Sequence, residues 1–580
     1  MTPSPPAVTI VFLGILLAGL GILAHALGFD PNPSWGMGRV ILTISGAITI
    51  LMGLLYDRFM RHWVELVTSK LATRPHEGSQ KIRDRYLLII SCTMMLLSGL
   101  VYTWVTTAGT WTRWDSYTYY YDDLAAGFQQ GHLHLATEPS DELLALPDPY
   151  NPATRAGVNY FIDASFYKGK YYLYWGPVPS LMLLLPKRMT GEAIGDLFLL
   201  YFFAIGTLIF KYALLSSIFR RFFDELPLWL FATGLLVAGL VGHHAWTLNS
   251  PRIYEAATTG GGFFFIAGYY FAYRALEKNF HHTDLMLAGT MWACAIGTRM
   301  TQALSVASVI ILMVVYYATR KNSPGMSGAL IPALAVGVPL TLAFLGLAWY
   351  NLVRFDSISE FGLYYMLVAG VDLRSFYDLL FSVQYIPQNI YNYLFAPFTL
   401  QPKFPFFATE RGLKEAVFPF YAVPSEYFTE RITGLFRSSP ILITAFLPPL
   451  FLTVERWRRP RAISTHMESG TGPLFQWMTI SLTASSVMGF LPVAAYFWAG
   501  NRFLADFLSP LSVLAVAGLW LGYSMLAKNR YVSPFLFIGI FAVTSFSIIV
   551  NLLLLNEVER IHTLNPDLYR QLTAFKLFIK

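Results

Sequence analysis

Long apolar runs recur along this chain and are separated by short polar stretches. A helix that rises about 1.5 Å per residue needs roughly 20 apolar residues to cross a hydrocarbon core of about 30 Å. By that criterion the pattern predicts an all-α polytopic membrane protein with about 13 transmembrane helices. The predicted spans are 8–27, 37–56, 86–107, 192–218, 227–247, 252–274, 284–299, 302–319, 329–352, 438–454, 474–498, 503–526 and 532–555.

Basic residues between the spans predict the orientation of the bundle. Segment 57–85 contains seven Lys and Arg residues, and such an excess is typical of cytoplasmic loops. Every second connection counted from this segment is basic as well, which supports the span count. We therefore expect a multi-pass protein of the inner or plasma membrane, with its N-terminus in the cytoplasm and its tail 556–580 on the extracytoplasmic side.

The spans and loops divide the chain into five parts. The predicted parts are the N-terminal spans 1–107, a first extracytoplasmic loop 108–191, a central bundle 192–352, a second extracytoplasmic loop 353–437, and a C-terminal bundle with its tail 438–580. Both long loops are rich in aromatic residues and proline, unlike a disordered segment. We expect them to fold against the membrane surface and to carry short interfacial helices, of which the apolar stretch 175–186 is one.

Composition narrows the function. The chain of 580 residues is 55% hydrophobic and only 13% charged, which excludes a soluble enzyme, a disordered protein and a nucleic-acid binder. Its two cysteines, Cys92 and Cys294, lie inside apolar runs, so no structural disulfide is expected. The sequence has no P-loop, no GxGxxG motif on a predicted strand and no HExxH. Energy for chemistry or transport must then come from the substrate itself or from an ion gradient.

The first extracytoplasmic loop holds the richest cluster of polar residues. Asp115 follows the third predicted span by a few residues, close to the depth of lipid headgroups. A carboxylate there could accept a proton from an acceptor hydroxyl about 3 Å away. The pattern also predicts a short helix over Ser116–Gln130, and Asp115 could cap its N-terminus instead.

The segment WDSYTYYYDDLAAGFQQGHL, residues 114–133, resembles the first outer loop of the C-type (GT-C) glycosyltransferases, which include protein O-mannosyltransferases and the lipid A aminoarabinose transferase. The resemblance implies a polytopic enzyme that uses polyprenyl-phosphate sugars on the extracytoplasmic side. It also implies that Asp115 is the catalytic Asp of that loop. The acid that often follows it is replaced here by Ser116, and Asp122 or Asp123 could supply a second carboxylate.

The remainder of the loop adds further candidates. Segment 158–189 resembles the aromatic and proline-rich passage into the next span of the same family, and Asp163 in it is a third catalytic candidate. Lys168 and Lys170 could bind a departing phosphate, or they could flank the turn between two short strands. Tyr117 and Trp175 are expected to contact the substrate.

Single arginines on the extracytoplasmic side form a second group of candidates. Arg252, Arg299 and Arg502 could cradle the phosphate of the donor, because a guanidinium matches phosphate oxygens. Snorkelling, or pairing with Glu255 or Asp506, is the alternative.

No metal or other cofactor is predicted, because the donors that the resemblance implies need none. The nearest candidate for a divalent site is the pair His132 and His134, which flank Leu133.

These observations favour a membrane glycosyltransferase that moves a sugar, with inversion, from a polyprenyl-phosphate donor to an acceptor hydroxyl. The expected partners are that donor, membrane lipids, and a glycan, lipid or protein acceptor. Two alternatives remain open: a secondary transporter or flippase of a lipid-linked or anionic solute, and a non-catalytic scaffold subunit of the same fold.

Overall fold

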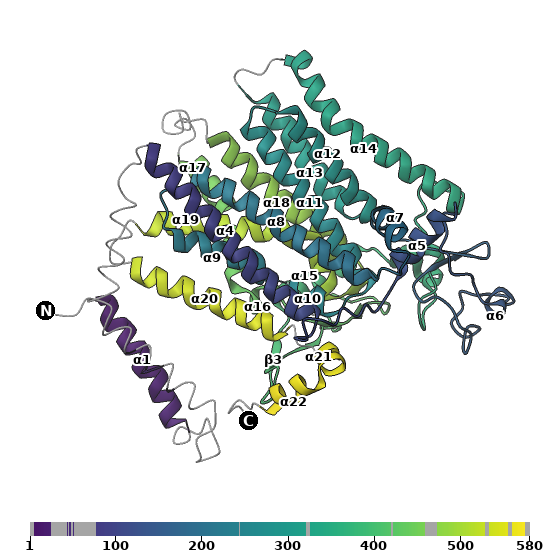
Figure 1. Ribbon diagram of the computed structural model, residues 1–580, viewed down its shortest axis with the longest axis horizontal. Helices are drawn as coiled ribbons and strands as arrows, with labels where there is room; N and C mark the ends of the chain where they lie inside the picture. The colour runs from purple at the N-terminus through teal and green to yellow at the C-terminus, as the bar shows by residue number, and fades with distance from the viewer. Residues whose placement is uncertain are drawn as a thin grey trace.

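A computed structural model describes residues 5–24, 77–242, 244–320, 325–418, 421–458, 472–527, 533–554 and 559–574, together with residues 43, 46, 47 and 50. Most of the predicted span 37–56, the basic segment 57–76 and parts of the C-terminal tail lie outside the described residues. In the described part the chain is mainly helical, as its apolar runs predict (Figure 1).

A helix is present at each of the other twelve predicted spans. These helices are α1 (Pro5–Leu23), α4 (Glu77–Thr106), α8 (Asp196–Phe222), α9 (Leu228–Leu240), α11 (Ile253–Glu277), α12 (His282–Thr298), α13 (Gln302–Ala318), α14 (Gly325–Phe355), α17 (Leu447–Arg458), α18 (Gly472–Ala495), α19 (Ala505–Leu526) and α20 (Ser533–Leu554). Within the described ranges, six helical segments are long and apolar enough to cross a membrane: 82–106, 196–222, 328–355, 472–495, 501–526 and 535–554. The chain is thus built as a membrane protein, and the count of thirteen spans stays a prediction.

Helix α11 lies at the centre of the bundle and packs against α8, α12 and α19 (Figure 1). Nearly all of its residues are buried. Small residues permit this close packing, because helices without large side chains between them approach closely. A Cβ atom at Gly268, for example, would lie 2.5 Å from the Trp292 ring of α12.

The two long loops fold together at one end of the bundle. The first contains α5 (Tyr120–Gln129), α6 (Asp141–Leu144), the hairpin β1 (Ser165–Tyr167) and β2 (Lys170–Tyr172), and α7 (Val178–Thr190). The second contains η2 (Leu363–Tyr365), η3 (Leu373–Leu379), η4 (Val383–Tyr385), α15 (Ile386–Phe395), β3 (Phe398–Leu400), β4 (Phe407–Arg411), β5 (Phe428–Thr429), β6 (Arg431–Ile432) and α16 (Leu435–Ser438). Asp163 N–H donates to the Leu367 carbonyl across the two loops.

A strand pairing ties the second loop to the bundle, and the first loop presents an exposed apolar helix face. Strand β5 pairs in parallel with β7 (Trp498–Ala499), which precedes the 3₁₀ helix η6 (Asn501–Leu504) and α19. Helix α7 covers residues 178–186 of the predicted interfacial stretch 175–186, and its Leu181, Leu185 and Met189 are exposed at a spacing of four residues. That spacing places them on one helix face, as an interfacial helix requires.

The C-terminal helices α21 (Glu559–Leu564) and α22 (Pro566–Ala574) return to the first loop, at the lower edge of the bundle in Figure 1. Ile561 and Leu564 pack with Ala108 and Trp104 in a small apolar cluster. Asn565 donates to the Ala108 carbonyl, and Arg113 donates to the Leu564 carbonyl. The segment that leads from α4 to Asp115 is therefore held by the end of the chain.

Candidate functional site

Asp115 lies in an irregular segment between α4 and α5, and its side chain is exposed. Its backbone carbonyl accepts a hydrogen bond of 2.8 Å from Arg560 of α21. Its carboxylate has no hydrogen-bond or ion-pair partner within the described part of the chain. Two residues further on, Tyr117 N–H donates to the Pro251 carbonyl, which fixes this segment beside the start of α11.

Asp115 does not cap the following helix, which begins at Tyr120 rather than Ser116. The cap comes from Asp196 at the start of α8, whose carboxylate accepts from the backbone N–H groups of Tyr120 and Tyr121 and from the Thr118 hydroxyl. Sequence reasoning missed Asp196 because an acid at that place looks like the first turn of its own span. The Asp115 carboxylate takes no part in this cap.

Ser116, where the resembling family often has a second acid, anchors the loop. Its hydroxyl donates to the Thr118 carbonyl and accepts from the Leu197 N–H at the start of α8. A Cβ atom at Gly195 would overlap the Ser116 side chain, so the Gly195 backbone lies in close contact with that side chain. Ser116 thus joins the first loop to the start of α8.

Asp122 is buried and paired. Its carboxylate lies 2.6 Å from the Lys187 ammonium of α7 and accepts from the Ile194 N–H at 3.0 Å. The neighbouring Asp123 accepts from the Thr137 N–H, and burial raises the pKa of its carboxyl. Both acids hold α5 in place, so neither presents a free carboxylate.

Asp163 lies in a partly buried turn with a positive φ of 59°. It accepts a short hydrogen bond from the Tyr254 hydroxyl of α11. Burial raises the pKa of Asp163, and the Tyr254 hydrogen bond and the positive charge of Arg502 oppose that rise. Asp163 is thus brought to the same helix terminus as the Asp115 segment.

Arg502 forms the centre of a charged cluster at this place. Its guanidinium lies 2.6 Å from Glu430, stacks over the Tyr254 ring at 5.0 Å, and is mostly buried. Glu430 also accepts from the indole N–H of Trp498. Glu255, one residue after Tyr254, is buried and its Oε2 has no partner among the described residues. Sequence reasoning missed Glu430, because only the β5–β7 pairing brings it to Arg502.

Arg299 pairs with Asp506, with 2.6 Å between Nε and Oδ1, and the Asp506 side chain is inaccessible to solvent. Thr301 and Gln302 also donate to Asp506. This is the pairing that the sequence offered as the alternative to phosphate binding. Arg299 therefore ties the end of α12 to the start of α19.

Arg252 stands at the N-cap of α11 and is exposed. Its guanidinium stacks over the Tyr117 ring at 5.7 Å, and that of Arg560 stacks over the same ring at 5.1 Å. Arg252 has no acidic partner in the described ranges. The predicted Arg252 and Tyr117 are thus in contact with each other, and Tyr117 is two residues from Asp115 in the sequence.

Lys168 and Lys170 occupy the turn of the β1–β2 hairpin. Lys168 pairs with Asp356 and Lys170 with Glu138, and all four side chains are well exposed. This matches the turn interpretation. Trp175, by contrast, is buried, and its ring contacts Tyr254 at 5.4 Å and Tyr120 at 6.2 Å.

The described residues contain no group of three or more His, Cys, Asp or Glu side chains that could hold a metal ion. His132 and His134 stack on each other with 4.6 Å between ring centroids.

Comparison with known proteins gives a limited result. No protein-family model matches this chain. No curated protein matches it either. Among solved structures, the chain is similar to the oligosaccharyltransferase AglB from Archaeoglobus fulgidus, in its apo form and in its complex with an inhibitory peptide and a dolichol-phosphate. Each match has a TM-score of 0.42 and 12% identity, and covers 80% of this chain and 55% of that chain. The chain thus spans about half the length of the protein it matches.

Proposed function

We propose that this chain is a membrane glycosyltransferase. It transfers a sugar from a polyprenyl-phosphate donor to an acceptor hydroxyl on the extracytoplasmic face, with inversion at the anomeric carbon. The acceptor is a glycan, a lipid or a protein. The main support is the exposed Asp115 carboxylate, which has no partner within the described ranges and belongs to a segment whose Tyr117 ring contacts the exposed Arg252.

The neighbouring acids favour Asp115 as the general base. Asp122 pairs with Lys187, and Asp163 accepts a hydrogen bond from Tyr254. Either acid would have to give up that contact before it could accept a proton from the substrate. A base needs an ionised carboxylate within hydrogen-bond reach of the acceptor. Asp115 is exposed and unpaired within the described ranges, while Arg560 fixes its backbone.

The reaction is a single displacement. Asp115 takes the proton of the acceptor hydroxyl as its oxygen forms a bond to the anomeric carbon. The bond from that carbon to the phosphate oxygen breaks, and the lipid phosphate leaves with the electron pair. Arg252 stabilises the charge of the leaving phosphate, since its guanidinium is exposed and lies at the positive end of the α11 dipole.

Replacing Asp115 with Asn tests this assignment. In proteoliposomes supplied with donor and acceptor, we expect Asp115→Asn to reduce transfer by about 10²–10⁴-fold, the usual contribution of a general base. Donor binding should remain. Asp141→Asn, which changes an exposed acid of the same loop, is the matched control and should leave transfer unchanged. Full turnover by Asp115→Asn would remove it from this role.

The same assay separates the alternatives. A scaffold subunit would bind the donor without turnover in the unchanged protein. A transporter would move a solute across the vesicle membrane in response to an ion gradient, with no sugar-transfer product. Either result would replace the glycosyltransferase proposal.

A further inference from the structure

Helix α15 of the second loop turns its amide side chains inward and large apolar side chains outward. Its fully buried residues are Gln388, Asn389, Asn392 and Tyr393. Ile390 and Phe395, by contrast, are 38% and 45% exposed. Ile386 and Leu394 share the helix face of Ile390, because they lie four residues before and after it. A helix at the surface of a soluble protein shows the opposite arrangement.

The buried side of α15 is held by hydrogen bonds to the rest of the protein. Asn389 donates to the Ala494 carbonyl at 2.8 Å and accepts from the Tyr427 hydroxyl at 2.7 Å. Asn392 donates to the Leu413 carbonyl and accepts from the Leu413 N–H. Rotating α15 to bury its apolar face would break these bonds and leave buried amides unpaired, at a large cost.

Both ends of α15 are tied to helices of the bundle. Before it, the Ser382 N–H donates to the Ala495 carbonyl at the end of α18. After it, the Ala396 carbonyl accepts from the Gly434 N–H, where the chain enters α16, the 3₁₀ helix η5 (Pro440–Phe446) and then α17. Backbone groups that are bonded within the protein in this way meet the requirement for a segment in hydrocarbon. With ten residues, α15 is about 15 Å long and too short to span a membrane.

The sequence of this part of the loop contains no charge. Residues 379–402 include no Asp, Glu, Lys, Arg or His, although the loop on either side of them is charged. Charged side chains are costly in hydrocarbon, whereas a solvated loop has no reason to exclude them over so long a run. Leu379, Phe381 and Val383 of this run are exposed as well, Val383 by 76%.

On one side, the exposed face of α15 continues into the surface of α18. Phe381 forms a bridge with Tyr496, the residue that follows α18. Helix α18 is long and apolar enough to cross a membrane, and its Val487 and Leu491 are 56% and 45% exposed. Exposed apolar side chains on such a helix face lipid.

On the other side, the same face continues into η5 and α17. The Phe395 ring lies 5.8 Å from the Phe436 ring of α16, and that ring lies 5.8 Å from Phe446 of η5. Phe446 and Leu450 of α17 are each 57% exposed. Helix α15 therefore joins two apolar surfaces of the bundle into one.

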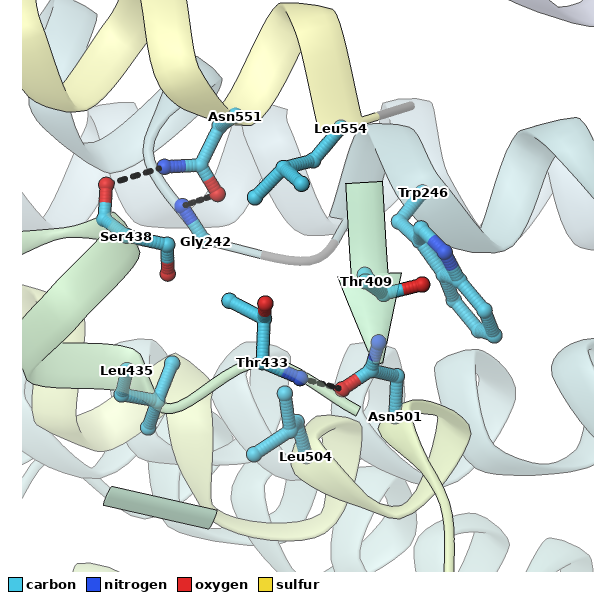
Figure 2. Close-up of a pocket in the computed structure, with 10 residues that line it drawn as sticks. All are labelled: Gly242, Trp246, Thr409, Thr433, Leu435, Ser438, Asn501, Leu504, Asn551 and Leu554. Carbon is cyan, nitrogen blue, oxygen red and sulfur yellow. Dashed lines mark hydrogen bonds between the residues drawn. The ribbon is translucent and has the colours of Figure 1, made fainter. Parts of the chain in front are cut away.

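A cavity lined by α16 is too small to receive an apolar partner. Its walls include Leu435, Thr433 and Asn501 (Figure 2), and its volume is about 30 Å³. That is room for about one or two water molecules and not for a hydrocarbon chain. An apolar partner of this loop therefore meets the outer face of α15, not this cavity.

We propose that residues 379–395, which include α15, re-enter the hydrocarbon layer of the membrane beside α18, with Val383, Ile390 and Phe395 against lipid acyl chains. The second loop is then partly embedded. An interfacial helix keeps a polar face in water, whereas the polar face of α15 is bonded to protein. This inference goes beyond sugar transfer and does not depend on it.

The embedded helix separates the lipid from the charged cluster at Arg502. The Tyr393 hydroxyl, on the buried side of α15, accepts from the Gly500 N–H at 3.1 Å, two residues before Arg502. The Arg502–Glu430 pair thus lies behind a single helix. Its close pairing fits this place, since charges near hydrocarbon are costly unless they are paired.

Spin labelling of the full chain in phosphatidylcholine vesicles tests the proposal. Each nitroxide is attached to a single cysteine, and its collisions with oxygen, which dissolves in hydrocarbon, and with a water-soluble nickel chelate are measured. The labelled variants are Val383→Cys, Ile390→Cys and Phe395→Cys, in a background of Cys92→Ser and Cys294→Ser. Leu491→Cys in α18 is the lipid-facing reference, and Glu415→Cys, an exposed position of the same loop, is the matched control.

We expect oxygen to collide with the three labels several-fold more often than the nickel chelate does, as at Leu491→Cys, and the reverse at Glu415→Cys. All three native side chains are exposed, so no label displaces a packed group, and any two folded variants decide the outcome. Labels as open to the nickel chelate as Glu415→Cys would place this face in water and overturn the proposal. Labels shielded from both reagents would show that a protein surface covers the face, which would overturn it as well.

Discussion

The buried Arg560 of α21 offers a direct test of how the C-terminus positions Asp115. Its side chain is 1% exposed, donates from Nε to the Thr106 carbonyl at 2.9 Å and from Nη2 to the Asp115 carbonyl at 2.8 Å, and stacks on Tyr117. We expect Arg560→Gln to release α21 and loosen the Asp115 segment. Transfer would then fall although Asp115 itself is unchanged.

The structure sets the size of this effect. Two hydrogen bonds from a charged donor contribute about 1.5–3 kcal/mol each. Against them stands the buried Nη1, which has no partner in the described part of the chain and costs about 1–3 kcal/mol. The net contribution of Arg560 to docking is then about 2 kcal/mol, which corresponds to roughly a 30-fold change in the docking equilibrium.

Hydrogen exchange measured by mass spectrometry follows this equilibrium. Peptides covering 106–117 and 559–574 should exchange about 30-fold faster in Arg560→Gln, in line with a loss of about 2 kcal/mol. The matched control is Arg570→Gln in α22, where the arginine pairs with Asp567 and both side chains are more than three-quarters exposed. Identical exchange of 106–117 in the two variants would refute the positioning role of Arg560.

Three further predictions follow from the packing. Asp122→Asn should lower the free energy of unfolding by about 3–5 kcal/mol, because it leaves a buried Lys187 ammonium unpaired. In thermal unfolding, the double variant Asp122→Asn with Lys187→Met should recover most of that loss. Gly176→Ala should lower Tm, because its Cβ would overlap a backbone carbonyl at the end of α12, while Gly337→Ala, with open space around it, should not. Burial raises the pKa of Asp163 in the folded protein, so the folded state loses stability as pH rises and this carboxyl ionises. Asp163→Asn should therefore raise Tm more at pH 7 than at pH 4. An equal shift in Tm at both pH values would contradict this.

Helices, including α7 over residues 178–186 of the stretch 175–186, and the hairpin could be predicted from local pattern. The apolar runs gave helices at all twelve predicted spans that fall in the described ranges, because the periodicity and length of a helix are carried by neighbouring residues. The turn at Lys168 and Gly169 was foreseeable for the same reason: both residues have positive φ, which Gly favours. Helix ends were less well placed, and α5 begins four residues after its predicted start because a distant acid caps it.

The sequence by itself determined that this chain is a helical membrane protein whose long loops carry acids and arginines. Only the tertiary structure decided which of those charges are paired. Arg299 meets Asp506 across 207 positions, and the Asp115 backbone meets Arg560 across 445. Such pairings depend on which helices pack together, and no local spacing encodes that choice. A charge taken out of water must find a counter-charge or hydrogen bonds wherever the fold provides them. For that reason an Asp115 carboxylate without a partner among the described residues could be recognised only after its neighbours had been matched.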